Sequence, residues 1–243
     1  MSAGAGAKYT VEDQQRMTRA KNYFAWQSEL VTRELGQRVV EVGCGLGNFT
    51  SKLLDRELVI ALDMEPDCVE RLKQRYAHCQ NLHAFTCDAQ HDGFREFARF
   101  RPDSCVCLNV LEHIAGDRQV LGDMVSMLVP GGVIVLLVPA FPALYGPIDE
   151  KLGHERRYTR QSMRNLAKEV GVRIRKVRYM NAIGFFGWWA NSHIFRRDAQ
   201  SAGQIEIFDR FIVPVISRVE SIIPPPFGQS LFVVLEKGGV RNS

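Results

Sequence analysis

Acidic and glycine residues follow the first apolar run of this 243-residue chain in a pattern that suits a nucleotide-like ligand. The β-branched run at 38–42 contains Glu41, and glycines stand at alternate positions directly after it: Gly43, Gly45 and Gly47. Glycine allows the backbone to turn sharply and to lie against a ligand. Such a turn between a buried strand and a helix predicts a binding site for a nucleotide-like molecule.

The spacing of these glycines indicates which kind of ligand is favoured. Dinucleotide-binding folds use G-x-G-x-x-G, and their third glycine would stand where this chain has Asn48. A pyrophosphate binds at the positive N-terminus of a helix. The carboxylate of Glu41 is better matched by a ligand with a sulfonium and an ammonium group. The alternative is that the glycines serve only tight packing.

Two later acidic residues end apolar runs in the same way. Asp63 offers two acceptor oxygens that match the two hydroxyls of a ribose, and Met64 beside it can pack on an adenine ring. Asp88 can accept a hydrogen bond from the adenine amino group while the backbone N–H of Ala89 donates to the ring. The alternatives are a helix cap at Asp63 and an ordinary turn residue at Asp88.

These residues resemble a known family. The segment Glu41-x-Gly43-x-Gly45-x-Gly47 resembles the first motif of the class I, Rossmann-like S-adenosylmethionine-dependent methyltransferases. The segment at 109–114, Asn-Val-Leu-Glu-His-Ile, resembles the N-x-L-E-H signature of their small-molecule branch, which includes ubiquinone-biosynthesis and sugar- or lipid-modifying enzymes. The resemblance spans about residues 9–180 and implies S-adenosyl-L-methionine as the cofactor. The predicted cofactor-binding residues are Glu41, Gly43, Gly45, Gly47, Asp63, Met64, Asp88, Ala89 and Asn109.

Two histidines are the candidate catalytic residues. Methyl transfer from a sulfonium needs the acceptor held close to the methyl group and water kept away. A hydroxyl acceptor also benefits from a general base, and an imidazole suits that role near neutral pH. His154, in the connection after the fifth predicted strand, and His113, after the fourth, both qualify by position. The alternatives are loop ordering against Asp149 or Arg157 for His154, and helix capping or packing for His113. Together with Glu112 they are three separated candidate metal ligands, and no metal is predicted.

A parallel sheet would bring these residues to one edge, because its strands have their carboxyl ends on the same side. Apolar runs alternate with helical patterns along the chain, which predicts an α/β fold with a doubly wound, Rossmann-like sheet. We expect seven strands, mostly parallel with an antiparallel last strand. The predicted strands are at 38–42, 57–63, 82–86, 104–108, 133–138, 172–180 and 230–235, and the helices at 9–35, 48–54, 67–77, 117–128 and 159–170.

The chain is predicted to form one methyltransferase domain at 9–239 after a disordered tail at 1–8. Residues 181–226 contain the aromatic segment at 185–189 and an apolar segment at 205–223, and they are expected to form a helical insertion on the acceptor side. The insertion could line an apolar acceptor, contact a membrane surface peripherally, or form a homo-oligomer contact. The alternative is simple packing over the sheet.

Charge and motifs exclude several partners. The net charge of +4 is spread over 31 basic and 27 acidic residues, so the chain lacks the basic footprint of a dedicated nucleic-acid binder. The N/D/S-P-P-Y/F motif of amino-methylating enzymes is absent after the fourth strand, as is the Pro-Cys of cytosine-carbon enzymes. Six cysteines without a regular framework, no signal peptide and no apolar run of ~20 residues predict a cytoplasmic protein.

The sequence therefore predicts a methyltransferase that acts on a small-molecule acceptor. Oxygen is the favoured acceptor atom, on an apolar or lipid-like natural product. Two alternatives belong to other classes: a non-catalytic protein that binds S-adenosylmethionine, and a nicotinamide-dependent oxidoreductase. The oxidoreductase is disfavoured by Asn48 and by the segment at 109–114.

Overall fold

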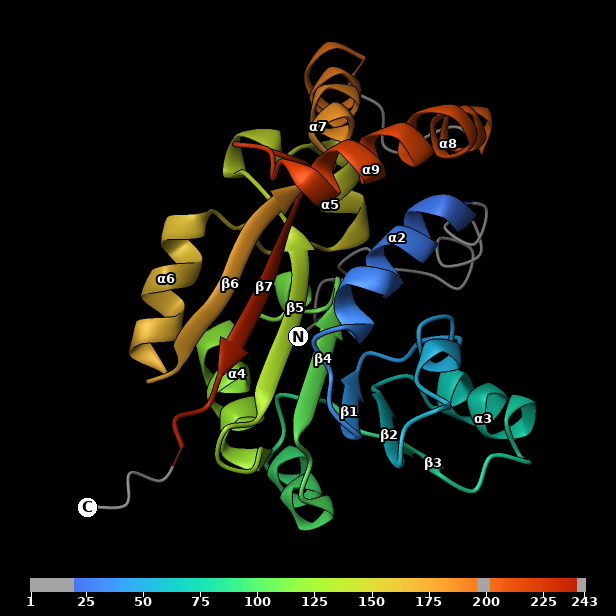
Figure 1. Cartoon of the computed structure of the whole chain (residues 1–243), viewed down its shortest axis with the longest axis vertical. Helices are drawn as coiled ribbons and strands as arrows, with labels where there is room; N and C mark the ends of the chain where they lie inside the picture. Colours follow the sequence, from blue (N-terminus) through green and yellow to red (C-terminus); the bar gives the residue numbers. More distant parts are fainter. Residues whose placement is uncertain (1–19, 196–201, 240–243) are drawn as a thin grey trace, which may run out of the picture.

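Seven strands form one sheet in the order β3-β2-β1-β4-β5-β7-β6 in the computed structural model, which describes residues 20–195 and 202–239 (Figure 1). Neighbouring strands pair in parallel except at β7, which is antiparallel to both β5 and β6. This confirms the predicted fold. The strands are β1 (Arg38–Val42), β2 (Leu58–Asp63), β3 (Leu82–Thr86), β4 (Ser104–Leu108), β5 (Val133–Pro139), β6 (Arg173–Met180) and β7 (Ser230–Glu236).

Burial along the strands follows their place in the sheet. Every residue of β5 is buried, as expected for a consecutive apolar run covered on both faces. Strand β6 is at the edge and carries exposed charged residues such as Arg173 and Lys176, which discourage pairing with another chain. All six cysteines are free thiols and are buried or half-buried.

Helices cover both faces of the sheet (Figure 1). On one face, Val40, Ile60 and Cys105 belong to an apolar cluster shared with η2, α4 and α6. On the other, Val39 and Val106 pack with α2 and α9, and α3 covers Ala61. The alternation of side chains along each strand thus feeds two cores. These helices are α2 (Lys21–Thr32), α3 (Pro66–Arg75), η2 (Asp92–Phe100), α4 (Asp117–Met127), α6 (Arg160–Glu169) and α9 (Val213–Ile222).

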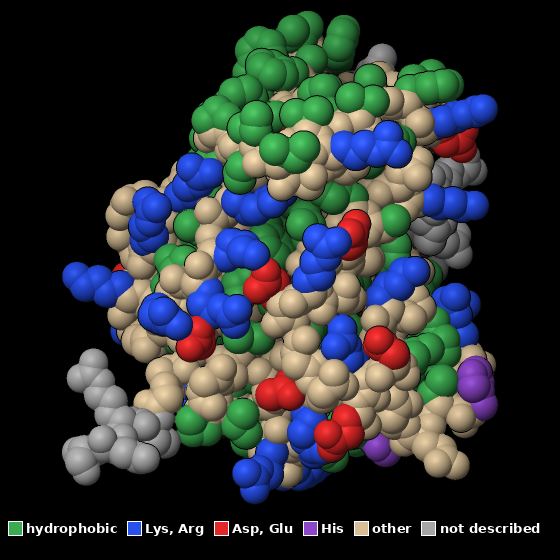
Figure 2. Space-filling view, in the orientation of Figure 1, with side chains coloured by type: hydrophobic (Ala, Val, Ile, Leu, Met, Phe, Trp, Pro, Cys, Tyr) green, Lys and Arg blue, Asp and Glu red, His purple; other side chains and the backbone are tan. Residues whose placement is uncertain are grey.

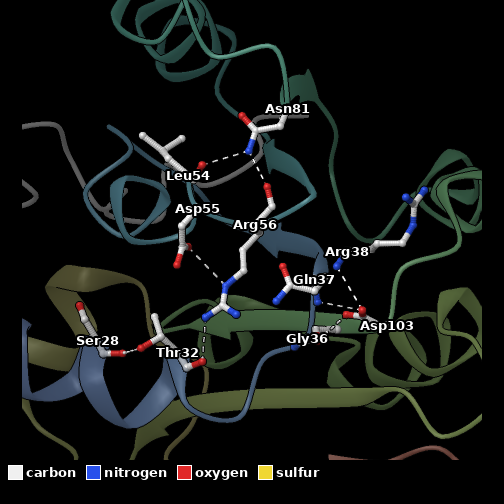
Figure 3. A network of polar contacts seen from close by, with 11 residues as sticks. Ser28, Thr32, Gly36, Gln37, Arg38, Leu54, Asp55, Arg56, Asn81 and Asp103 are labelled. Atoms are coloured by element: carbon white, nitrogen blue, oxygen red, sulfur yellow. Dashed lines mark hydrogen bonds and ion pairs between the residues drawn. The ribbon is translucent and has the colours of Figure 1, made fainter.

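A polar network fixes the amino-terminal edge of the sheet (Figure 3). One carboxylate oxygen of Asp103 accepts the backbone N–H groups of Gln37, at 2.8 Å, and Arg38, at 3.2 Å. The side chain of Arg56 donates to the carbonyl of Thr32 at 3.0 Å, and Asn81 donates to the carbonyl of Arg56 at 2.6 Å. These bonds tie the end of α2 and the start of β1 to the connection before β2, which leaves the opposite edge for the site.

A helical segment stands before β7, where the insertion was predicted, at the top of Figure 1. Its α9 is tied to the start of α7 by Glu220, which accepts the backbone N–H groups of Asn181 and Ala182, both at 2.9 Å. Its η6 is tied to α2 by Asp209, which accepts the N–H of Tyr23 at 2.8 Å. The other elements of the segment are α7 (Ala182–Trp189), η5 (Ala190–Ile194), α8 (Ala202–Ile207) and η6 (Phe208–Ile212).

Some predicted elements differ from the observed ones. The helix predicted at 48–54 is only a 3-10 turn, η1 (Thr50–Lys52), because Thr50 and Ser51 use their hydroxyls on Glu41 and on the carbonyl of Asn48 instead of extending a helix. The long connection after β5 contains η4 (Pro142–Leu144) and α5 (Pro147–Leu152). The predicted tail at 1–8 and the first part of the predicted helix at 9–35 lie outside the described residues. Among the described helices, none has the length and apolar character to cross a bilayer.

Candidate active site

The glycine turn after β1 adopts a backbone that other residues rarely reach. Gly43, Gly45 and Gly47 have φ angles of 79°, 50° and 78°. A Cβ on Gly43 would lie 2.3 Å from Cγ2 of Val110, and one on Gly47 would lie 2.2 Å from Cδ1 of Leu72. Gly43 and Gly47 are therefore required both by conformation and by close approach, and Gly45 is favoured by its conformation. The turn packs directly against the segment at 109–114, as two motifs of one site would.

Asp63, at the end of β2, holds the same turn. Its Oδ2 accepts the N–H of Gly45 at 2.7 Å, and its Oδ1 accepts the N–H of Glu65 at 3.0 Å. Each carboxylate oxygen can accept a second hydrogen bond. Partial burial raises the pKa of Asp63, although the two backbone donors oppose this. The carboxylate is positioned on the glycine turn with acceptor capacity left for a diol.

Glu41 lies buried beneath the turn. Thr50 donates its hydroxyl to Oε2 of Glu41 at 2.6 Å, and burial raises the pKa of Glu41 to about 8. Thr50 was not among the predicted site residues, because a hydroxyl nine positions away carries no recognisable spacing signal. A buried carboxylate with one neutral donor suits a positively charged group nearby, since such a group would stabilise its ionised form.

The remaining predicted cofactor residues also lie where strands end. Met64 follows β2 and is 56% exposed. Asp88 follows β3, is half-buried and accepts the N–H of Gln90 at 2.9 Å, and Ala89 beside it is buried. Asn109 follows β4, is exposed and has a φ of 54°. These residues share the carboxyl edge of β1, β2, β3 and β4, where a nucleoside would bind.

The edge fits S-adenosylmethionine in its chemistry. The glycine turn offers close backbone approach, Asp63 offers diol acceptors, and Glu41 offers negative charge. Exposed Met64 offers an apolar surface for a purine. Carboxylates dominate this edge, whereas a pyrophosphate would need backbone N–H groups at a helix N-terminus.

A second polar cluster lies beside this edge, in the connection after β5. Nδ1 of His154 is 2.7 Å from Oδ1 of Asp149, and Nε of Arg157 donates to the same oxygen at 2.8 Å. Asp149 is fully buried, and the side chain of Arg157 is 1% exposed. Trp188 of α7 stacks on Arg157, with its ring centroid 4.7 Å from Cζ. A buried carboxylate therefore orients the imidazole of His154 through Nδ1.

Two residues that follow β4 lie close to the imidazole of His154. Nε2 of His154 is 4.0 Å from Oε1 of Glu112, and the ring centroids of His113 and His154 are 4.7 Å apart. Burial raises the pKa of Glu112 to about 8. Burial and the neighbouring His154 lower the pKa of His113 to about 4. Residues 41 positions apart in sequence thus form one cluster.

The structure brings the predicted residues together in two groups. The predicted cofactor residues line the ends of β1 to β4, and His113, His154 and Glu112 converge beside them. Asp149 and Arg157 were weighed only as loop-ordering partners of His154, and Trp188 had no assigned role. The contact of His154 with Asp149 is the one weighed from the sequence. The stacking of Trp188 on Arg157 joins segments far apart in the chain, and the sequence pattern carries no signal for it.

Comparisons with known proteins agree with this arrangement. The model of a family described as a methyltransferase domain matches residues 40–134. That range includes the glycine turn, Asp63 and the segment at 109–114. Comparison with curated protein sequences gives no match.

Solved methyltransferase structures share the fold. A chain in the complex between the Haloferax volcanii Trm112 methyltransferase activator and a methyltransferase is 17% identical, with a TM-score of 0.64 and coverage of 93% of this chain and 95% of that one. An O-methyltransferase family protein from Burkholderia thailandensis is 11% identical, with a TM-score of 0.61 and coverage of 94% and 60%.

A third solved structure was determined with the demethylated cofactor. The N-methyltransferase NodS from Bradyrhizobium japonicum, in complex with S-adenosyl-L-homocysteine, is 15% identical, with a TM-score of 0.52 and coverage of 93% and 87%. Similarity at these identities shows a common fold and does not identify an acceptor. Residues 40–134 thus match a methyltransferase domain, and the seven-stranded sheet has the Rossmann-like fold of the class I, S-adenosylmethionine-dependent methyltransferases.

Proposed function

We propose that this protein transfers a methyl group to an oxygen atom of a small, apolar or lipid-like acceptor. The observation that carries the proposal is the position of His154, whose Nδ1 is held by Asp149 at 2.7 Å while Nε2 faces the cluster beside the cofactor edge. An imidazole oriented by a buried carboxylate is the usual arrangement of a general base. A carboxylate acceptor is already ionised near neutral pH and would have less need of such a base.

The chain's own residues have separate roles in this proposal. Asp63 and the glycine turn bind the cofactor, which supplies an electrophilic methyl group when bound. Nε2 of His154 takes the proton of the acceptor hydroxyl as the new O–C bond forms. Asp149 is a positioning residue, because it sets the tautomer and orientation of that imidazole. His113 is the second candidate base, and its lowered pKa keeps it neutral.

The helical insertion supports an acceptor that is carried by a membrane. Large apolar side chains are exposed along it and form a continuous surface at the top of the molecule (Figure 2). Basic side chains outnumber acidic ones on the face below it (Figure 2). We name the exposed apolar side chains of the insertion the apolar surface. It comprises Ile183, Phe186, Trp189, Ile194, Phe195, Ile207, Phe211, Val215, Val219, Ile222 and Ile223.

An anionic lipid surface is the occupant that best fits this composition. Arg210, Arg218 and Glu206 are exposed among the apolar residues, whereas Asp209 and Glu220 are buried in internal hydrogen bonds, so the exposed charge is on balance basic. Aromatic and basic side chains together are typical of helices that lie in a membrane interface. We propose that residues 9–239 are one domain whose segment 181–226 docks on such a surface and forms part of the acceptor side. A cytoplasmic location stays a prediction.

Methyl-transfer assays test the proposed reaction. Purified protein is incubated with methyl-labelled S-adenosylmethionine and panels of apolar phenols, hydroxylated lipids and matched amines. We expect labelled ethers with an oxygen acceptor, and a loss of at least ~100-fold in kcat for His154→Gln, in line with removal of a general base. His91→Gln is the control, because His91 is exposed and far from the cluster in sequence. Cofactor binding with no turnover on any panel would favour the non-catalytic alternative.

Vesicle sedimentation tests the lipid surface. We expect the protein to pellet with vesicles of phosphatidylglycerol and phosphatidylcholine, and to pellet less with phosphatidylcholine alone. Replacing Phe186 and Trp189 by serine removes two exposed rings and is expected to abolish pelleting. A dimer in sedimentation velocity, broken by the same changes and accompanied by no vesicle binding, would identify a second copy of the chain as the occupant.

A further inference from the structure

We propose that Glu112, His113 and His154 form a binding site for a divalent transition-metal cation of the Zn²⁺ or Fe²⁺ type. One ligand atom from each residue lies within 4.8 Å of the other two. Two of the residues follow β4 and the third lies in the connection after β5, so the fold, and not the sequence, assembles them. Binding of the cation does not depend on the proposed methyl transfer. The role of the cation in that reaction rests on the proposed function.

The strongest observation is the state of Glu112. Its side chain is fully buried, and neither carboxylate oxygen has a hydrogen-bond partner within the described part of the chain. Buried polar atoms in folded proteins almost always have a partner, so two unpartnered oxygens on one carboxylate need an explanation. Among the described residues, the imidazole of His154 approaches Oε1 to 4.0 Å, which is beyond hydrogen-bond distance, and Arg157 acts on the carboxylate only through its charge. A cation between them would satisfy the carboxylate.

The two imidazoles are already held as metal ligands usually are. A ligating histidine normally gives its second ring nitrogen to a carboxylate or a backbone carbonyl, which fixes the ring. His154 does so through Nδ1, which is 2.7 Å from Asp149. His113 makes hydrogen bonds with the backbone of Leu152 and Gly153. Arg157 in turn fixes Asp149, so the supporting contacts extend one layer further.

The ligand types indicate the class of cation. Two imidazoles and one carboxylate are a common ligand set of catalytic zinc and of non-haem iron(II), whereas Mg²⁺ and Ca²⁺ prefer oxygen ligands. Metal–ligand bonds of about 2.0–2.2 Å place ligand atoms roughly 3–3.5 Å apart. Each side chain therefore has to move by about 1 Å or less from its position in the structure. Three protein ligands leave at least one coordination position open.

The open position gives the site a second way to ionise a hydroxyl. A cation lowers the pKa of a bound oxygen acid by several units. A hydroxyl of the acceptor, once bound there, would release its proton to water and present an alkoxide or phenolate to the methyl group. Nε2 of His154 would then be a ligand and not the base. Ionisation by the cation requires Glu112 and His113 as ligands. General-base catalysis by His154 alone does not require either residue.

Binding of Co²⁺ tests the site without any acceptor or activity. Chelator-treated protein is titrated with Co²⁺, and the visible d–d absorption of a low-coordinate complex is recorded, followed by displacement with Zn²⁺ in a calorimeter. We expect one bound cation per chain in the parent protein. Glu112→Gln and His113→Gln are expected to lose the absorption band and at least ~100-fold in affinity, and Asp149→Asn about 10–100-fold.

Two controls separate binding at this site from other causes. His91→Gln removes an exposed histidine that can bind Co²⁺ adventitiously, and it is expected to leave the absorption band unchanged. Thermal unfolding checks that the Glu112→Gln, His113→Gln and Asp149→Asn variants are folded. Absence of the band in the parent protein, or an unchanged band in folded Glu112→Gln and His113→Gln, would overturn the proposal. If the band is lost in both variants while methyl transfer persists, the cation site stands and its catalytic role fails.

Discussion

Replacement of Asp63 by asparagine tests the cofactor-binding edge most directly. Asp63 is held on the glycine turn by the N–H groups of Gly45 and Glu65, and each of its oxygens has room for one more hydrogen bond. The carboxylate is predicted to accept both hydroxyls of the cofactor ribose. Asparagine has the same shape but only one acceptor oxygen, so it can accept from one hydroxyl and without the assistance of charge.

The size of the effect follows from those bonds. A hydrogen bond to a charged group contributes about 1.5–3 kcal/mol, and a neutral one about 1 kcal/mol. Loss of one bond and weakening of the other cost roughly 2 kcal/mol, which raises the Kd for S-adenosyl-L-homocysteine about 30-fold. The turn also loses one backbone contact, because the amide nitrogen cannot accept. We expect the free energy of unfolding to fall by about 1 kcal/mol.

Titration calorimetry with S-adenosyl-L-homocysteine measures this change, and thermal unfolding checks the fold. Asp67→Asn is the matched control, since Asp67 is an exposed acid on the first turn of α3, four residues from Asp63. Its Kd is expected to equal that of the parent protein. A folded Asp63→Asn variant whose Kd stays within about threefold of the parent value would refute the assignment of Asp63 to the ribose.

Three further changes probe the site. Gly43→Ala places a methyl group 2.3 Å from Cγ2 of Val110 at a φ of 79°, so calorimetry is expected to show no cofactor binding, with partial recovery in the Gly43→Ala, Val110→Ala double variant. Asp149→Asn leaves the buried Arg157 without its carboxylate, and denaturant unfolding is expected to show a loss of about 3–5 kcal/mol; an unchanged midpoint would contradict the buried ion pair. Glu41 has a pKa of about 8 in the folded protein, above its unfolded value, so the unfolded chain loses its proton first and stability falls as pH rises from about 5 to 8. Between those pH values, the free energy of unfolding is expected to fall by roughly 2–4 kcal/mol less in Glu41→Gln than in the parent protein. Parallel plots of the free energy of unfolding against pH for the two proteins would contradict this role of Glu41.

The central strands of the sheet could be predicted from the sequence because they are buried on both faces. The run at 133–138, for example, is uninterrupted by polar residues, and β5 is buried along its whole length. The positions of Asp63 and Glu41 followed from the same reasoning, since a residue at the end of a parallel strand lies at the functional edge. Local patterns are sufficient where burial is continuous.

The second cluster was beyond such patterns. His154 and Glu112 were recognised only as separate residues, and their approach to 4.0 Å depends on how the connection after β5 folds over the end of β4. The segment at Thr50–Lys52 was predicted to be helical and is a 3-10 turn. The hydroxyl of Thr50 donates to Glu41, and this contact across nine positions has no periodic signal in the sequence. Spacing along the chain does not predict contacts between side chains that follow different strands.

The stacking of Trp188 on Arg157 has a consequence for how turnover would be regulated. Trp188 and the exposed Phe186 and Trp189 belong to the same short helix, α7, so the proposed docking of the outer rings would act on the helix that contacts the guanidinium fixing Asp149. A protein with this connection would behave as an interfacial enzyme. Its rate would then depend on the area of lipid offered to it, and not only on how much acceptor is dissolved.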